Sequence, residues 1–485
     1  MDDAQLLGIL NRINTWWNGD PVPPSLLKAE YRRRDFHTVK KQLIDGRPII
    51  AIRGPRQVGK TTLCGQLIEW LNSPPYLVPS EFIMYLNIDN SQIISDPENI
   101  IRDSLEVYQQ YVLGTSFREV EEEIFVFIDE IQKLDEWAST LKYYTDTYSN
   151  LKFVATGSVS TLIEQDASET LIGRISDQVI MPMKFVDVLE YREVFEDDEL
   201  LEASTSLREA LQTSIIEEDY GPISTELTAF FGTNENKVPE VRAEMNRYLL
   251  KGGYPGVLDD ELTDAYAALD QDLKYTVTGD LANVFDITKP EKALQILSLL
   301  VESTTSKLNV QNVAQTAEIG RDTVERYLDY LSEFFLISEC STYTTSEYKT
   351  GGRPKMYLQD VGLYNTLAGT MHEETLRDSQ KLGPILETVM CDHCRRLQFY
   401  LSEHQNANVS YWDRRGEVDF VLDGTGTPLP IEVKNGDTTR EDLRGLRNFV
   451  EETDAPFGLA INNSGELKQG DNVLHVPYWL FLLLC

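Results

Sequence analysis

The sequence has 485 residues, of which 41% are hydrophobic, enough for about three domains with buried cores, so a predominantly disordered chain is excluded. Its formal net charge is −35 and the acidic residues are spread along the whole length, which excludes a generally basic nucleic-acid-binding protein. Such a charge is also typical of adaptation to high salt, and a local basic groove can persist within an acidic total.

The cysteines and the two ends of the sequence predict a cytoplasmic protein without a membrane anchor. There are 5 Cys at scattered positions, an odd number that fits a reducing compartment better than a disulfide scaffold. The first residues, MDDAQLLGIL, are acidic and unlike a signal peptide, and the last, VPYWLFLLLC, are too few to span a bilayer. We expect this last segment to form a buried strand.

The first 45 residues are expected to form a helical lead-in, which ends in the basic sequence YRRRDFHTVKK. Short apolar runs follow, and most are rich in β-branched or aromatic residues and separated by stretches long enough for helices. They are PIIAI (48–52), FIMYLNID (82–89), IFVFIDE (124–130), KFVATGS (152–158) and DQVIMPM (177–183). This alternation predicts an α/β fold with a parallel sheet that is covered by helices on both faces.

The loop between the first of these strands and the next helix carries the strongest functional signal. Its sequence GPRQVGKT, residues 54–61, matches the pattern GxxxxGK[ST] in full. Glycines let the backbone curl so that several N–H groups point at phosphate oxygens, and the dipole of the following helix favours the same anion. Lys60 can then reach the terminal phosphates of ATP, and the Thr61 hydroxyl can bind Mg²⁺. The residues expected at the nucleotide are Gly54, Pro55, Arg56, Gln57, Val58, Gly59, Lys60, Thr61 and Thr62.

The run IFVFIDE supplies two carboxylates at the tip of an apolar strand. Asp129 at this tip can hold Mg²⁺, directly or through water. Glu130, one residue later, can polarise the attacking water. A strand that meets solvent at two acids is the alternative, and the phosphate-binding loop favours the catalytic interpretation.

A further strand, FVATGSVS (153–160), ends in hydroxyl residues. In ATPases with such a phosphate-binding loop, a polar strand tip of this kind lies between the γ-phosphate and the catalytic acid, so either Thr156 or Ser158 could orient water there. Arg174 follows in LIGRISD and is a candidate sensor of the γ-phosphate, in its own subunit or in a neighbouring one. A surface arginine paired with nearby acids is an equally good interpretation of Arg174.

Residues 185–288 have a helical and acidic pattern, broken at GGYPG, and are expected to form a helical lid. In residues 289–350 a short helix (VQNVAQTA), a turn (EIG) and a longer helix (RDTVERYLDYLSEFFLI) follow one another in the rhythm of a helix-turn-helix. The segments after them, up to RPKMYLQD, could form the strands of a wing, which predicts a winged-helix domain.

The predicted winged helix has two possible uses. Arg321 and Arg326 lie near the start of its second helix, where recognition helices contact DNA. Asp322, Glu325 and Asp329 interrupt any basic face, which favours a lid or a protein contact instead.

The last part of the sequence is expected to hold a helix with Glu387 (LGPILETVMCDHCRRL), a strand with Asp419 (VSYWDRRGEVDFVL) and a strand with Glu432 and Lys434 (TPLPIEVKNG). Strand alternation puts Glu432 and Lys434 on one face. Asp419 can join Glu432 in binding Mg²⁺, and Glu387 could complete the site. Lys434 can lower the pKa of a water or stabilise a scissile phosphate. This combination predicts a nuclease core, or an inactive descendant of a nuclease that only binds DNA or protein.

Together these motifs resemble prokaryotic AAA-type ATPases with a C-terminal nuclease-like domain of unknown function. The resemblance rests on RGPRQVGKTTL, FIDEIQKLDEW, ATGS, GR, GGYP, KMYLQDVGLYN and EVDFVL…PIEVK, and covers most of the chain, from about residue 53 to 434. It implies a P-loop sheet in which one strand separates the loop strand from the strand of the catalytic carboxylate. It also implies a restriction-endonuclease-like terminal domain. The motif residues that carry over directly are Gly54, Gly59, Lys60, Thr61, Asp129 and Glu130.

The expected domains are a lead-in (1–45), a P-loop AAA-type ATPase domain (46–184), a helical lid (185–288), a winged-helix-like domain (289–350) and a nuclease-like α/β domain (351–485). One functional hypothesis is an ATPase whose cycle gates nucleic-acid binding or cleavage, with DNA held by the winged helix and the terminal domain. The other is a nucleotide-dependent switch that binds a protein partner and has an inactive terminal domain. A homo-oligomer is compatible with both.

Overall fold

A computed structural model describes residues 2–90, 99–134, 136–158, 171, 173–196, 198–344, 352–403, 408–423, 426–436, 438–453, 455–463, 467–470 and 472–485. The chain forms two compact units, residues 1–181 with 333–335 and residues 182–332 with 336–485. The first unit ends before the predicted boundary at residue 184. The reason is that the Met183 amide donates to the Gly253 carbonyl and the Phe185 amide to His393 Nε2, so these residues belong to the second unit.

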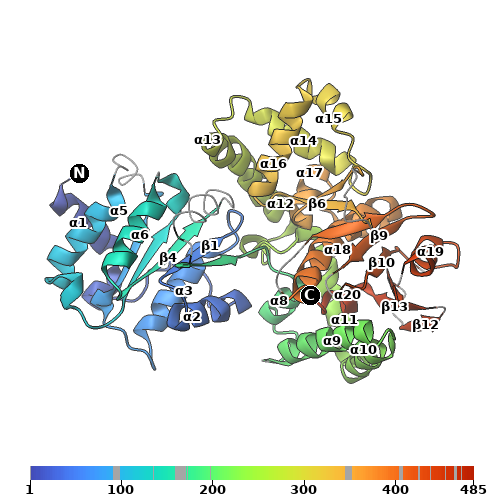
Figure 1. Cartoon of the computed structure of the whole chain (residues 1–485), viewed down its shortest axis with the longest axis horizontal. Helices are drawn as coiled ribbons and strands as arrows, with labels where there is room; N and C mark the ends of the chain where they lie inside the picture. The colour runs from blue at the N-terminus through green and yellow to red at the C-terminus, as the bar shows by residue number, and fades with distance from the viewer. Residues whose placement is uncertain are drawn as a thin grey trace. The chain divides into compact units, whose positions relative to one another are not determined.

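The first unit contains a parallel sheet with the strand order β2-β3-β4-β1-β5. Its strands are β1 (Ile49–Arg53), β2 (Ile83–Asn87), β3 (Ile124–Asp129), β4 (Leu151–Gly157) and β5 (Ile175–Val179). Its longer helices are α1 (Asp3–Ile13), α2 (Arg34–Asp45), α3 (Lys60–Asn72), α5 (Ile100–Val107) and α6 (Trp137–Thr147), shown in blue to teal in Figure 1. The predicted parallel α/β sheet is confirmed, and β4 lies between β1 and β3 as the resemblance implied.

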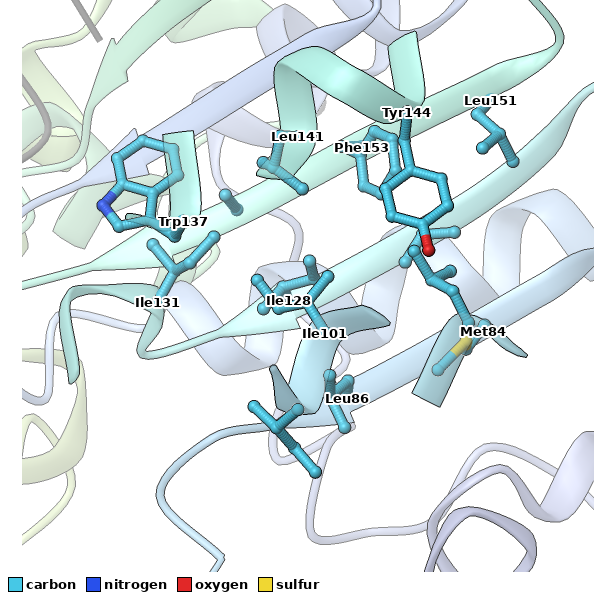
Figure 2. Close-up of a cluster of buried hydrophobic side chains, with 14 of the residues drawn as sticks. Met84, Leu86, Ile101, Ile128, Ile131, Trp137, Leu141, Tyr144, Leu151 and Phe153 are labelled. Atoms are coloured by element: carbon cyan, nitrogen blue, oxygen red, sulfur yellow. The ribbon is translucent and has the colours of Figure 1, made fainter. Parts of the chain in front are cut away.

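Alternation along the strands gives this sheet two apolar faces. On one face, strand residues such as Ile128 and Phe153 pack with Trp137 and Leu141 of α6, as Figure 2 shows, and with α1 and α5. On the other face, neighbouring strand residues such as Phe127 pack with α2 and α3. Burial on both faces explains why β1 to β4 are continuous apolar runs, whereas the edge strand β5 is partly exposed and carries polar residues.

The lead-in is helical only at its two ends, so the prediction for residues 1–45 holds in part. Between α1 and α2 the chain runs in mostly irregular backbone and is tied to the sheet and to α3 by side chains. The indole nitrogens of Trp16 and Trp17 both donate to the carbonyl of Ile83. Gln66 of α3 donates to the carbonyls of Ala29 and Tyr31.

The first part of the second unit is helical, as predicted for the lid. The helices of the second unit up to the first strand are α8 (Phe185–Tyr191), α9 (Glu199–Ile216), α10 (Gly221–Thr233), α11 (Val238–Lys251), α12 (Leu262–Tyr275), α13 (Ala282–Val284), α14 (Pro290–Glu302), α15 (Val310–Ala317) and α16 (Arg321–Glu333). The helix-turn-helix pair is present as α15 and α16. None of the described helices is both long and apolar enough to cross a membrane.

The second unit also holds an eight-stranded mixed sheet with the order β12-β13-β11-β10-β9-β8-β6-β7. Its strands are β6 (Ile337–Thr342), β7 (Lys355–Leu358), β8 (Val409–Trp412), β9 (Val418–Leu422), β10 (Leu429–Val433), β11 (Gly458–Asn462), β12 (Lys468–Gly470) and β13 (Val473–Pro477). Its other helices are α17 (Val361–Ala368), α18 (Ser379–Leu401), α19 (Arg444–Glu452) and α20 (Tyr478–Leu482), in orange to red in Figure 1.

The second unit differs from four predictions. β6 and β7, the expected wing, form the edge of the terminal sheet because β6 pairs in parallel with β8. The predicted boundary at residue 350 lies outside the described residues, but strands on either side of it share one sheet. The segment VSYWDRRGEVDFVL is a pair of antiparallel strands, because it bends near Gly416. The end of the chain is a strand followed by a short helix, which begins after Pro477.

Two of the motifs behind the family resemblance hold each other in place within the second unit. Asp360 accepts hydrogen bonds from the amides of Gly253, at 2.9 Å, and Gly362, at 2.7 Å. Asn365 Nδ2 donates to the carbonyls of Leu249 and Leu250. GGYP and QDVGLYN therefore join α11 to α17, which is a structural role.

His393 on α18 gives a test of this buried framework. Its Nε2 accepts from the Phe185 amide and its Nδ1 lies 2.9 Å from the Val389 carbonyl, so the ring is a neutral Nδ1–H tautomer. Burial lowers the pKa of His393 from 6.5 to about 4. Protonation of His393 therefore favours the unfolded state. The stability that the neutral ring contributes is fully present above pH 6.5 and is lost as the pH falls toward 4.

We expect the free energy of unfolding of the native protein to fall, relative to that of His393→Gln, by about 3 kcal/mol between these pH values. Urea denaturation of both proteins across this pH range measures the difference between their free energies of unfolding. Both proteins have the same carboxylates, so the titration of these carboxylates does not affect the difference. A difference that does not change with pH would contradict a neutral, buried His393.

Candidate functional site

The phosphate-loop motif lies where predicted, between β1 and the amino terminus of α3. Gly54 has φ 151° and Gly59 has φ 103°, backbone conformations that favour glycine. A Cβ on Gly54 would lie 2.0 Å from the carbonyl oxygen of Ile180, so the close approach of the two segments requires glycine there. Of the other loop residues, Pro55 and Val58 are buried, Gln57 is exposed, and Arg56, Thr61 and Thr62 are half-buried.

Lys60 lies inside the curl of the loop. Its ammonium group donates to the carbonyls of Gly54 and Pro55, both at 2.9 Å, and to Ser158 Oγ at 3.1 Å. The side chain is buried, so a cation is held at the loop beside the carboxyl end of β4. This is the position in which it can meet an anion bound by the loop amides.

The two predicted magnesium ligands of the nucleotide site are in direct contact. Thr61 Oγ1 donates to Asp129 Oδ2 at 2.8 Å, and Thr156 donates to the other carboxylate oxygen of Asp129. Tyr85 of β2 also donates to Asp129 Oδ2, at 2.7 Å. Burial, and then the charge of Asp129, raise the pKa of the Tyr85 phenol, which keeps it a donor. The hydroxyl and carboxylate oxygens of Thr61 and Asp129 suit Mg²⁺.

Glu130 follows β3 in a left-handed backbone conformation, with φ 59°. Its amide donates to Thr156 Oγ1 at 3.1 Å, and its carboxylate accepts from Ser158 Oγ at 3.4 Å and from Gln132. Ser158 thus joins Lys60 to Glu130, whereas Thr156 supports Asp129. The two hydroxyls therefore have different partners, whereas the sequence alone left open which of them could orient water.

Arg174 is not brought to this site. It precedes β5, which starts beside Ile49 at the amino end of β1, whereas the loop follows the carboxyl end of β1. Five strand residues separate these edges, about 16 Å at about 3.3 Å per residue. Arg174 Nε instead donates to Asp146 at 2.7 Å, which matches the interpretation as a surface pair. The expectation that Arg174 senses a phosphate in its own site is therefore wrong.

The second candidate site, on α18 and the terminal sheet, brings its predicted polar residues close to one another. β9 and β10 are antiparallel, with Phe420 opposite Ile431, which places Asp419 and Glu432 side by side. The Val433 amide donates to Asp419 at 2.8 Å. Lys434 Nζ lies 2.5 Å from Glu432 Oε1, so these two side chains share a face as predicted.

Asp419 and Glu432 of this cluster are buried, Glu387 is half-buried, and the three acids are electrostatically linked. Burial, and then the charge of Asp419, raise the pKa of both Glu387 and Glu432, and burial raises the pKa of Asp419. Glu387 accepts from the Tyr357 hydroxyl at 3.0 Å. Such shifts are typical of sites that bind a cation or protons.

The sequence did not identify Lys355 as a member of this cluster. Its side chain is buried on β7 and its ammonium lies 2.5 Å from Glu417. Burial opposes its charge, but the charges of Asp419, Glu387 and Glu417 and the hydrogen bond to Glu417 together outweigh burial and raise the pKa of Lys355. Its only sequence signal is a lysine at the start of an apolar run, in the segment predicted to form the wing.

A divalent metal fits the terminal cluster in one respect. Glu432 Oε2 is buried, and the described residues offer it no hydrogen-bond partner, which leaves an oxygen available as a ligand. Over the described ranges no three or more His, Cys, Asp and Glu side chains are already gathered closely enough to hold a metal. Binding would therefore require Glu387, Asp419 and Glu432 to converge further.

Comparisons with known proteins identify domains along the chain. Residues 46–189 match the AAA domain family, residues 242–374 a domain of unknown function (DUF8612), and residues 382–481 a domain of unknown function (DUF4143). The segment that matches the AAA domain family contains the whole loop site.

The relatives that cover most of the chain are described as uncharacterized proteins. Two proteins of Methanocaldococcus jannaschii are each 24% identical. MJ1637 matches over 96% of this chain and 92% of its own length, and MJ1544 over 83% and 77%. Protein Rv2008c of Mycobacterium tuberculosis is 22% identical over 92% of this chain and 83% of its own. Among solved structures, the Walker-type ATPase PABY2304 of Pyrococcus abyssi aligns with a TM-score of 0.38 and 15% identity, over 72% of this chain and 99% of that one.

Proposed function

We propose that the AAA domain binds and hydrolyses Mg²⁺-ATP, and that this cycle gates nucleic-acid binding or cleavage by the terminal sheet and α18. One observation carries the first half of the proposal. The loop, Lys60, the Thr61–Asp129 pair and Glu130 meet at the carboxyl edge of one parallel sheet, inside a segment that matches the AAA domain family.

Each residue has a role in this proposal. The loop amides and Lys60 hold the phosphates, and Lys60 exchanges its bonds to the Gly54 and Pro55 carbonyls for phosphate oxygens. Thr61 and Asp129 would hold Mg²⁺, which neutralises phosphate charge and orients the terminal phosphate. Glu130 accepts a proton from the attacking water, and Ser158 holds the Glu130 carboxylate beside Lys60.

The nuclease half of the proposal is supported by the terminal cluster. Asp419, Glu432 and Glu387 would hold Mg²⁺, and Lys434 beside Glu432 would stabilise charge on a scissile phosphate. The restriction-endonuclease-like fold that the sequence resembles is consistent with acids on adjacent strands β9 and β10 and on a helix, α18.

We expect Asp419→Asn to remove metal-dependent cleavage of DNA or RNA, by about 100-fold or more, because the isosteric amide is a poor ligand for Mg²⁺. The assay uses single- and double-stranded substrates with Mg²⁺ or Mn²⁺ at low and high salt. Asp423→Asn, an exposed acid just after β9, is the matched control and should cleave like the native protein. If the native protein cleaves no substrate, or Asp419→Asn cleaves equally well, the nuclease half is refuted.

A second function, a nucleotide-dependent switch that binds a protein partner, is favoured by the acidic character of α16. Arg321, at its start, is paired with Glu325 at 2.9 Å, which reduces its availability for DNA. Lys355 and Lys434 also already neutralise part of the terminal cluster. ATP turnover measured with and without DNA separates the two functions. Stimulation by DNA supports the first, and turnover indifferent to DNA supports the switch.

A further inference from the structure

Arg33, just before α2, joins two parts of the first unit that are far apart in sequence. Its Nη1 donates to the Val58 carbonyl in the phosphate loop at 2.8 Å, and its Nη2 donates to the Met181 carbonyl at 2.7 Å. Asp35 lies 3.2 Å from the same guanidinium, whose side chain is 14% exposed. One planar, charged fork thus holds two carbonyl groups at once.

The bond to Val58 bears directly on the loop. The carbonyl of Val58 and the amide N–H of Gly59 belong to one planar trans peptide, so they point in opposite directions. By fixing the carbonyl, Arg33 fixes the direction of the Gly59 N–H, one of the loop amides at the start of α3. Amides held in advance in this way lose less entropy when they bind an anion.

The bond to Met181 reaches the segment by which the chain leaves the first unit. Within that unit the Ile180 amide donates to the Arg53 carbonyl at 2.7 Å, and the Ile180 carbonyl packs against Gly54. The last residues of the first unit are therefore bonded to the end of β1 through the backbone and linked to the loop through Arg33.

The residues that follow are equally anchored within the second unit. The Pro182 carbonyl accepts from Arg396 Nη2 at 2.8 Å, and the Phe185 amide donates to His393 at 3.2 Å. Both partners lie on α18, which also carries Glu387 of the terminal cluster. His393 follows Glu387 by six residues, or about 9 Å along the helix at about 1.5 Å per residue. We call residues 180–185 the connector.

We infer that Arg33 is a positioning residue of ATP hydrolysis, which orients the phosphate loop through Val58 and ties the state of that loop to the connector through Met181. This inference rests on the proposed ATPase function. It adds a residue outside the motif and a route, through the hydrogen bonds of Arg33 and the chain of the connector, by which a change at the loop reaches α18.

The test compares Arg33→Lys with Arg32→Lys in the full chain. A single ammonium cannot span both carbonyls as the fork does. We therefore expect kcat for ATP to fall by about ten- to hundredfold in Arg33→Lys, because small losses of alignment at a reacting centre have effects of this size. Arg32 pairs with Glu69 on the surface, at 3.0 Å, and its replacement should leave kcat within about twofold of the native value.

Two further measurements separate positioning from damage to the fold. Calorimetry should give one ATP bound per chain in Arg33→Lys, with an affinity within about tenfold of native. Hydrogen exchange at the amides of Met183 and Phe185 should change on addition of Mg²⁺-ATP in the native protein and in Arg32→Lys, but not in Arg33→Lys.

The inference is overturned if Arg33→Lys keeps the native kcat, or if its connector amides still respond to nucleotide. It is also overturned if kcat falls only in proportion to a lower number of binding sites per chain. A native protein that binds no ATP at all is a different result, since it refutes the proposed function itself.

Discussion

Replacing Lys60 by alanine should weaken ATP binding by about 10- to 100-fold and reduce hydrolysis to background. The ammonium group lies inside the curl of the loop, and hydrogen bonds to charged groups contribute about 1.5–3 kcal/mol each. The change also leaves the Gly54 and Pro55 carbonyls and Ser158 without this donor. Calorimetry and phosphate release measure the two effects.

The matched control for Lys60→Ala is Lys41→Ala, an exposed lysine on α2. It removes the same charge from the same unit and should bind and hydrolyse ATP like the native protein. Native-like affinity and turnover in Lys60→Ala would show that the loop is not the nucleotide site.

Replacing Glu130 by glutamine should affect hydrolysis but not binding. We expect ATP to bind about as well as in the native protein and turnover to be lower by about 100- to 10,000-fold. The amide has the same shape and can still accept from Ser158 Oγ, but it cannot take a proton from water. Single-turnover hydrolysis at saturating ATP isolates the chemical step from binding.

Glu122→Gln, at an exposed acid before β3, is the control for Glu130→Gln. Its rate should equal that of the native protein. If Glu130→Gln also hydrolyses ATP at the native rate, another group activates the water, and Glu130 acts only in holding Ser158 and Gln132 in place.

The first sheet could be predicted because its strands are buried on both faces and its loop has a rigid spacing. Apolar runs located β1 to β4 to within a residue or two, and the motif located Lys60, Thr61, Asp129 and Glu130. The order of the strands came from the resemblance to AAA-type ATPases, since local patterns do not determine which strands pair.

The terminal sheet was harder to predict because its pairings are distant in sequence. β6 pairs with β8 across 69 residues, from Cys340 to Val409, and no local pattern in either strand indicates this partner. The tail was read as a strand because it is apolar throughout, yet a fully buried helix has the same composition, and α20 is one.

Sites were missed where a single residue carries the role. Tyr85 and Lys355 lie within apolar strands. Their roles follow from their contacts with Asp129 and Glu417, which the sequence does not reveal. Arg174 was placed at the wrong edge, although a residue that directly precedes a parallel strand must lie at the amino edge of the sheet. Arg33 likewise has no motif, since its partners are backbone carbonyls.

Titration of the native chain with ATP and Mg²⁺ in a calorimeter, at high and at low salt, tests the central claim most directly. The loop, Lys60 and the Thr61–Asp129 pair predict one saturable site per chain whose affinity requires Lys60. A titration without any heat of binding at either salt concentration, from protein shown to be folded, would contradict the account.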